Sequence, residues 1–128
     1  MRLLLDTHAL LWWFTDDDRL SANARALIGD QRNDVFVSAA SAWEIATKHR
    51  LGKLPGLDEA VSRYTELLAA DGFQSWPVTH AHALRAGGYA LAHRDPFDRM
   101  LAAQSELDGL RLVTTDGAFA SFGIETIW

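Results

Sequence analysis

The chain has 128 residues, of which 48% are hydrophobic and 23% are charged, and its net charge is −5 with histidine neutral. This length and composition are those of an ordinary globular protein, so we expect residues 1–128 to fold as a single domain. The chain contains no cysteine, which excludes disulfide bonds and thiolate metal sites.

The N-terminal segment argues against export and against a membrane anchor. Asp6 interrupts the apolar residues that a signal sequence would require, and no apolar run approaches the roughly 20 residues of a membrane span. We therefore expect a cytoplasmic protein that does not associate with a membrane.

The acidic net charge is unusual for a protein that binds nucleic acid over a broad surface. Only Lys48 and Lys53 are lysines, and the other basic residues are arginines, which suit bidentate phosphate contacts. A nucleic-acid substrate would therefore have to be held at a local site.

Short apolar runs alternate with segments of helical periodicity along the whole chain. We expect strands over residues 2–5, 35–37, 73–76, 110–113 and 123–128. We expect helices after Asp6 as far as the Asp16–Asp18 run, and over residues 22–31, 38–51, 57–69, 79–84 and 96–107. This alternation predicts an α/β fold in which helices cover both faces of a parallel sheet of about five strands.

Four acidic residues stand where the ends of strands and the starts of helices are expected. Asp6 follows the first strand and Asp116 the fourth, Glu44 lies one to two turns into the helix after the second strand, and Asp98 lies in the first turn of the helix before the fourth. Ligands of such folds bind outside the carboxyl ends of the strands. Because carboxylates that gather there repel one another, a divalent cation has to neutralise them, and oxygen ligands suit Mg²⁺ or Mn²⁺. The pattern predicts a metal-dependent enzyme that acts on a phosphate ester.

Each of these acids also has a structural explanation when it is considered alone. Asp6 could cap a helix, Asp98 could complement a helix dipole, Asp116 could form a turn, and Glu44 could be a solvated helix position. Their expected convergence at one edge of the sheet favours the functional interpretation.

Four ordered motifs resemble the PIN-domain family, and most closely the VapC-type toxins of bacterial toxin–antitoxin pairs. They cover residues 3–8, 38–45, 93–99 and 114–116. The resemblance implies a three-layer α/β/α domain and a Mg²⁺-dependent endoribonuclease that a cognate antitoxin inhibits and that often forms a homodimer. It places the family's acidic quartet on Asp6, Glu44, Asp98 and Asp116.

Within the quartet we expect Asp6 and Asp98 to be the more direct metal ligands. Glu44 and Asp116 would complete the site through water or a second ion, because Mg²⁺ usually keeps several waters. Asp95 precedes Pro96 and is expected to cap the helix that carries Asp98 rather than to bind metal.

Several neighbouring residues are candidates for substrate binding. Arg94 and Arg99 could contact phosphate, although Arg99 could instead hold a carboxylate in place. Thr7 and Thr114 could orient substrate or metal-bound water, although hydroxyls near strand ends often act as caps. His93 could bind RNA or stabilise its own loop.

Trp12 and Trp13 are adjacent on a helix and cannot both face inward. We expect at least one of them to be exposed or covered by a partner, as in a homodimer or an antitoxin groove. A cation from the antitoxin could then enter the acidic quartet and displace metal or RNA.

Three other functions compete with this interpretation. A phosphoacceptor receiver would need paired acids after the first strand and a late lysine, and an aspartyl phosphatase would need two acids spaced by one residue. The sequence Asp6-Thr7-His8 provides neither arrangement. A catalytically silent binding module of the same fold stays open, because a sequence does not reveal turnover.

Overall fold

A parallel five-stranded sheet forms the centre of the molecule, which a computed structural model describes over residues 1–128. The strand order is β3-β2-β1-β4-β5, and each pair of neighbours is parallel. The direction of the strand order reverses at β1, so the crevice between the carboxyl ends of β1 and β4 is a topological switch point. The strands are β1 Arg2–Leu5, β2 Asp34–Ser38, β3 Gln74–Trp76, β4 Arg111–Val113 and β5 Thr126–Ile127.

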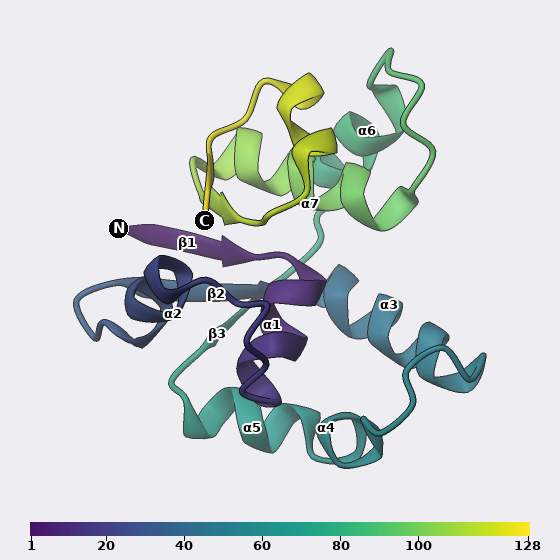
Figure 1. The fold of residues 1–128 in the computed structure, drawn as a ribbon. Helices are drawn as coiled ribbons and strands as arrows, with labels where there is room; N and C mark the ends of the chain where they lie inside the picture. Colours follow the sequence, from purple (N-terminus) through teal and green to yellow (C-terminus); the bar gives the residue numbers. More distant parts are fainter.

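Helices cover both faces of this sheet, which confirms the predicted three-layer α/β/α fold. Figure 1 shows α6, α7 and the 3₁₀ helix η1 on one side and α1 to α5 on the other. The helices are α1 Thr7–Phe14, α2 Ala22–Gly29, α3 Ala39–Arg50, α4 Asp58–Ser62, α5 Tyr64–Ala70, α6 His80–Gly88, α7 Pro96–Asp108 and η1 Gly117–Phe122. None of them combines the length and apolar character needed to cross a membrane.

The core has two halves because successive residues of each strand point to opposite faces. Leu3 and Leu5 belong to a cluster of 14 buried residues with α1 and α2. Leu4 belongs to a cluster of 11 with α6 and α7. All three side chains are fully buried. Since apolar side chains fill both faces of the sheet, polar groups are left to gather at its carboxyl edge.

The structure departs from the predicted elements in three places. The helix expected over residues 57–69 is two helices, α4 and α5, which meet at Arg63. Helix α6 continues through Gly87 and Gly88, where an interruption was expected. The last strand covers only Thr126–Ile127 and follows the 3₁₀ helix η1, which the sequence pattern did not predict.

Candidate active site

The first two acids of the site follow neighbouring strands. Asp6 comes directly after β1 and caps α1, where its Oδ1 accepts a 2.7 Å hydrogen bond from the backbone N–H of Ala9. Asp116 comes three residues after β4 and caps η1, where its Oδ1 accepts from the N–H of Ala118 at 2.9 Å. Because β1 and β4 are paired, the two acids lie at the same edge of the sheet. Asp6 is 6% exposed, whereas Asp116 is exposed.

Burial raises the pKa of the Asp6 carboxyl above its ordinary value. Hydrogen bonds from Thr114 and from the Ala9 N–H, together with the charge of His8, lower that pKa, and the negative charge of Asp116 raises it. The pairing of β1 with β4 places the two carboxylates near each other, and the charge of Asp116 disfavours ionisation of Asp6. They form the first acidic pair of the site.

Glu44 reaches the same edge from α3 and is only 4% exposed. The hydroxyl of Thr7 donates a 2.6 Å hydrogen bond to its Oε1. The ammonium of Lys48, one helical turn further along α3, donates to its Oε2. Ser41 Oγ lies 3.2 Å from Thr7 Oγ1 and extends this buried network. Glu44 is therefore a held, buried carboxylate rather than the solvated helix position that its sequence context also allowed.

Asp98 stands in the first turn of α7. Its Oδ2 lies 2.9 Å from Nε2 of His93, in the loop before the helix. The pKa of Asp98 is raised to about 6, mainly by burial and also by the charges of Asp95 and Glu44, while the hydrogen bond with His93 opposes the rise. The influence of Glu44 makes these two acids the second pair of the site.

The predicted helix cap at Asp95 is confirmed. One oxygen of Asp95 accepts hydrogen bonds from the N–H groups of Phe97 and Asp98 at 2.9 and 3.1 Å. Pro96 occupies the first turn, where it has no N–H to leave unpaired. Asp95 therefore fixes the start of the helix that presents Asp98.

The four acids share one edge, yet they do not form a closed cage. No group of three or more aspartate, glutamate or histidine side chains lies close enough together to hold a metal ion. Each acid instead has a partner within the chain, as described above for Ala9, Ala118, His93 and the two groups at Glu44. These contacts hold each of the four carboxylates in place separately.

The donor set nevertheless fits a hard divalent cation. All four groups are carboxylates, and oxygen ligands are those that Mg²⁺ and Mn²⁺ prefer. The second carboxylate oxygens of Asp98 and Asp116 make no hydrogen bond within the chain. These oxygens are available to a metal ion or to water around one.

Two predicted substrate contacts differ sharply in their surroundings. Arg94 is exposed and makes no hydrogen bond or ion pair, so its guanidinium is available for phosphate. The guanidinium of Arg99 is not available for phosphate, because it donates to five backbone carbonyls between the end of α6 and the next loop. These carbonyls belong to Ala86, Gly87, Tyr89, Leu91 and His93. The predicted phosphate contact at Arg99 is therefore corrected to the fixing of this backbone.

The hydroxyl groups of Thr7 and Thr114 also form hydrogen bonds within the protein. Thr7 is 6% exposed and donates to Glu44. Thr114 is 4% exposed, accepts a 3.0 Å hydrogen bond from the N–H of Asp116, and stabilises the carboxylate of Asp6. This burial corrects the prediction of direct substrate contact, because both hydroxyls orient carboxylates instead.

Neither tryptophan of α1 is fully exposed, and cover of one of them by a partner stays a prediction. Trp12 packs edge-on against Trp128, and Trp13 packs against Phe73, so both are half-buried within the chain. The exposed tryptophan is Trp43 on α3, at 63% exposure. Trp128, which follows β5, and Phe73, which precedes β3, pack against α1. The helical pattern of α1 alone does not reveal these distant neighbours.

Lys48 is the residue of this site that the sequence analysis missed. The signal was present, because a glutamate followed four residues later by a lysine is a favourable pair on one helix face. The pair became recognisable as part of the site only once Glu44 was found to be buried.

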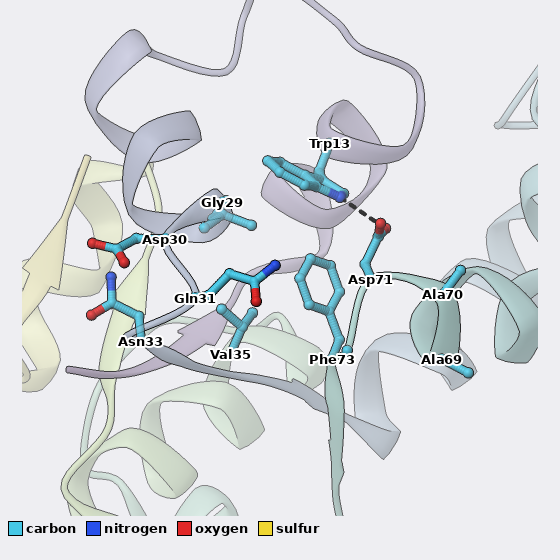
Figure 2. Close-up of a pocket in the computed structure, with 12 residues that line it drawn as sticks. Trp13, Gly29, Asp30, Gln31, Asn33, Val35, Ala69, Ala70, Asp71 and Phe73 are labelled. Carbon is cyan, nitrogen blue, oxygen red and sulfur yellow. Dashed lines mark hydrogen bonds between the residues drawn. The ribbon is translucent and has the colours of Figure 1, made fainter.

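A cavity of about 480 Å³ lies away from the acids, at the other end of the sheet. Figure 2 shows its lining near the start of β2 and β3, with Val35, Phe73 and Trp13. The indole N–H of Trp13 donates to Asp71 at 3.0 Å across it. Because the strands are parallel, this end is opposite the acidic edge, so the cavity takes no part in the candidate site.

A comparison with protein families matches residues 3–125 to the PIN domain. Among curated proteins, Ribonuclease VapC16 of Mycobacterium tuberculosis is 43% identical over 76 residues. That alignment covers 55% of this chain and 54% of the relative, so it spans only about half of either protein.

Solved structures share the fold over almost the whole chain. VapBC2 from Rickettsia felis, in a complex with a DNA fragment from its promoter, matches with a TM-score of 0.72 at 15% identity and covers 99% of this chain and 98% of its own. FitAcB from Neisseria gonorrhoeae matches with a TM-score of 0.72 at 21% identity and covers 100% of this chain and 97% of its own.

Proposed function

The chain belongs to the PIN domain family, and from this membership we propose that it is a Mg²⁺-dependent endoribonuclease, with Mn²⁺ as an alternative ion. We further propose that it folds as one domain over residues 1–128 and acts in the cytoplasm as the toxin of a bacterial toxin–antitoxin pair. The similarity to Ribonuclease VapC16 supports RNA as the substrate. The observation that carries the proposal is the gathering of Asp6, Glu44, Asp98 and Asp116 at one edge of the sheet.

The proposed roles follow from how each acid is held. Asp6 and Asp98 are the more direct ligands of the ion, and Glu44 and Asp116 act through water or a second ion. Bound there, a divalent cation would activate water and neutralise charge that develops on the phosphoryl oxygens. Arg94, which is exposed and unpaired, contacts the RNA phosphate.

Cleavage of RNA by the purified protein tests this function. Antitoxin-free protein should cut single-stranded RNA in Mg²⁺ or Mn²⁺ and stop when EDTA is added. Asp98→Asn keeps the shape of the side chain and removes its charge, so it should abolish cleavage while the protein stays folded. Undiminished cleavage in EDTA, or by Asp98→Asn, contradicts the mechanism.

The toxin role implies a protein inhibitor, and we propose a cognate antitoxin as the partner. The similarity of the fold to VapBC2 and FitAcB supports the proposal of such a partner. We propose that the antitoxin places an arginine or lysine among the acids, where Lys48 already provides an internal cation to Glu44. Raising the Mg²⁺ concentration should then weaken inhibition, and neutralising the inserted cation should restore cleavage.

We also propose that the protein forms a homodimer through the surface around Trp43. The Trp43 ring stacks edge-on against Phe97 at 4.9 Å, and both line a hollow of about 340 Å³ with Val78 and Met100. A two-fold interface pairs the same patch of both copies. This patch carries both an exposed ring and an apolar hollow, so the ring of one copy can enter the hollow of the other. Leu84 on α6 is 78% exposed and is a further apolar side chain available to a second copy.

A further inference from the structure

A cavity of about 400 Å³ lies beside α1 and is separate from the four acids. Its lining includes His8 and Trp12 of α1, Arg19 from the segment after α1, and Lys53 from the segment after α3. Its volume is within the range of small-molecule sites, roughly 300–1,000 Å³. The cavity is therefore large enough for a small ligand.

Three flat groups are already stacked in the lining of this cavity. The His8 ring stacks on Trp12 at a centroid distance of 5.6 Å and an interplanar angle of 21°. The Arg19 guanidinium lies 5.0 Å from the centre of the Trp12 ring, and Asp17 holds it there through a 2.7 Å ion pair. Because Trp128 packs edge-on against Trp12, the central ring is fixed. His8 is exposed, so it can accept one more flat ring.

The cavity also contains a free cation. Lys53 is exposed and makes no side-chain hydrogen bond or ion pair. Most arginines of this acidic chain are paired with carboxylates, as in Arg25–Asp16 and Arg63–Glu59. An unpaired cation beside stacked rings suits a group that combines a base with a phosphate, and it suits an apolar peptide less well.

The position of the cavity connects it to the chemistry. His8 stands in the first turn of α1, two residues after Asp6. A ligand stacked on His8 therefore lies next to the edge of the sheet where Asp6 presents its carboxylate.

We propose that this cavity is a nucleobase-binding subsite for a single-stranded RNA nucleotide adjacent to the cleaved phosphate. The base stacks on His8, and Lys53 contacts its phosphate. Stacking on an aromatic ring is tolerant of base identity, so the subsite contributes affinity rather than sequence selectivity. The inference rests on the proposed ribonuclease function.

The test uses Asp98→Asn protein, which should bind RNA without cutting it, and an oligoribonucleotide that the wild-type protein cleaves. Single bases around the cut site are removed one at a time, and Kd is measured by fluorescence anisotropy at fixed salt. One abasic position should weaken binding by about tenfold. Adding His8→Ala should weaken binding of intact RNA by a similar factor and remove the abasic penalty, because both changes delete the same contact.

Control variants isolate the two contacts. His8→Phe should retain the abasic penalty, because it keeps a ring. His80→Ala changes an exposed histidine on α6 and should alter neither value. Lys53→Gln should reduce the slope of log Kd against log salt by about 0.7, as expected for the loss of one phosphate contact to a single strand.

The outcomes separate this inference from the proposed function. If RNA is cleaved and bound, but removal of the base weakens binding equally in Asp98→Asn protein with and without His8→Ala, the subsite is wrong and the ribonuclease function stands. An absence of both binding and cleavage overturns the ribonuclease function with it. If His8→Ala and Lys53→Gln weaken antitoxin binding and leave RNA binding unchanged, the cavity belongs to the protein partner and the subsite is wrong.

Discussion

The Nε2 atom of His93 lies 2.9 Å from the Oδ2 atom of Asp98. Burial disfavours the ionised form of this carboxyl group, and the hydrogen bond with His93 opposes that effect. Burial raises the pKa of Asp98 from 3.8 to about 6, so between these pH values the folded protein holds a proton that the unfolded chain has released. The free energy of unfolding therefore decreases as the pH rises through this window. Above pH 6 the ionised Asp98 lowers stability in the absence of metal.

Asp98→Asn should remove this pH dependence. In EDTA at pH 7.5 the variant should be more stable than the wild type by on the order of 2 kcal/mol, and at pH 4 or below the advantage should disappear. Thermal unfolding at both pH values measures the difference. Asp116→Asn is the matched control, because Asp116 is exposed and an asparagine keeps the helix cap. Equal stability of Asp98→Asn and wild type at pH 7.5 would contradict the prediction.

Lys48→Met should destabilise the protein, because it leaves the buried carboxylate of Glu44 without its cation. The loss should be on the order of 2 kcal/mol, below the value for a fully buried pair because Lys48 is about one-third exposed. Urea unfolding in EDTA measures this loss.

A double-mutant cycle tests whether the effect of Lys48 operates through Glu44. Adding Glu44→Gln to Lys48→Met should recover much of the lost stability, because the unpaired charge is then absent. Lys53→Met, which removes a lysine without an ion-pair partner, should change stability little. Additive effects of the Glu44 and Lys48 substitutions would show that the ion pair is not a stabilising unit.

Arg99→Lys should destabilise the loop between α6 and α7 although it preserves the charge. A lysine has no planar fork with which to reach the five carbonyls that Arg99 binds. We expect a loss on the order of 3 kcal/mol and faster amide exchange over residues 87–95. Arg85→Lys is a suitable control, because Arg85 forms an exposed ion pair with Glu106. Unchanged exchange in Arg99→Lys would argue against the structural role of this arginine.

The location of the acids could be predicted because it depends on local rules. Asp6 and Asp116 follow apolar strands directly or within a few residues, and parallel strands end at one edge. The sequence does not reveal which groups pair across that edge. The contacts of Glu44 with Thr7 and of Asp98 with His93 depend on the packing of separate elements, and only the three-dimensional arrangement shows them.

The errors in the predicted elements have physical causes that involve distant residues. Two adjacent glycines predict a break, yet α6 includes Gly87 and Gly88. Arg99 donates to the carbonyls of Ala86 and Gly87, which stabilises this end of the helix. Trp12 and Trp13 are covered by Trp128 and Phe73, which lie far away in the sequence. In both cases a tertiary contact overrides the local signal.

Trp43→Asp should prevent self-association. The wild-type protein at micromolar concentration should have a mass near twice 14.2 kDa, because burial of the exposed Trp43 ring in the hollow formed by Val78, Phe97 and Met100 of a second copy removes apolar surface from water. A charge at position 43 could not be buried there without a partner, so the variant should be a monomer with an unchanged circular dichroism spectrum. Light scattering over a dilution series measures both masses.

Leu51→Ser is the matched control for this variant. Leu51 follows α3, is 52% exposed and lies outside the apolar hollow, so its loss should leave the dimer intact. If Trp43→Asp protein remains dimeric, the dimer interface lies at another surface. If the wild-type protein is monomeric throughout the dilution series, the homodimer proposal is wrong. The exposed surface around Trp43 would then be available to the antitoxin.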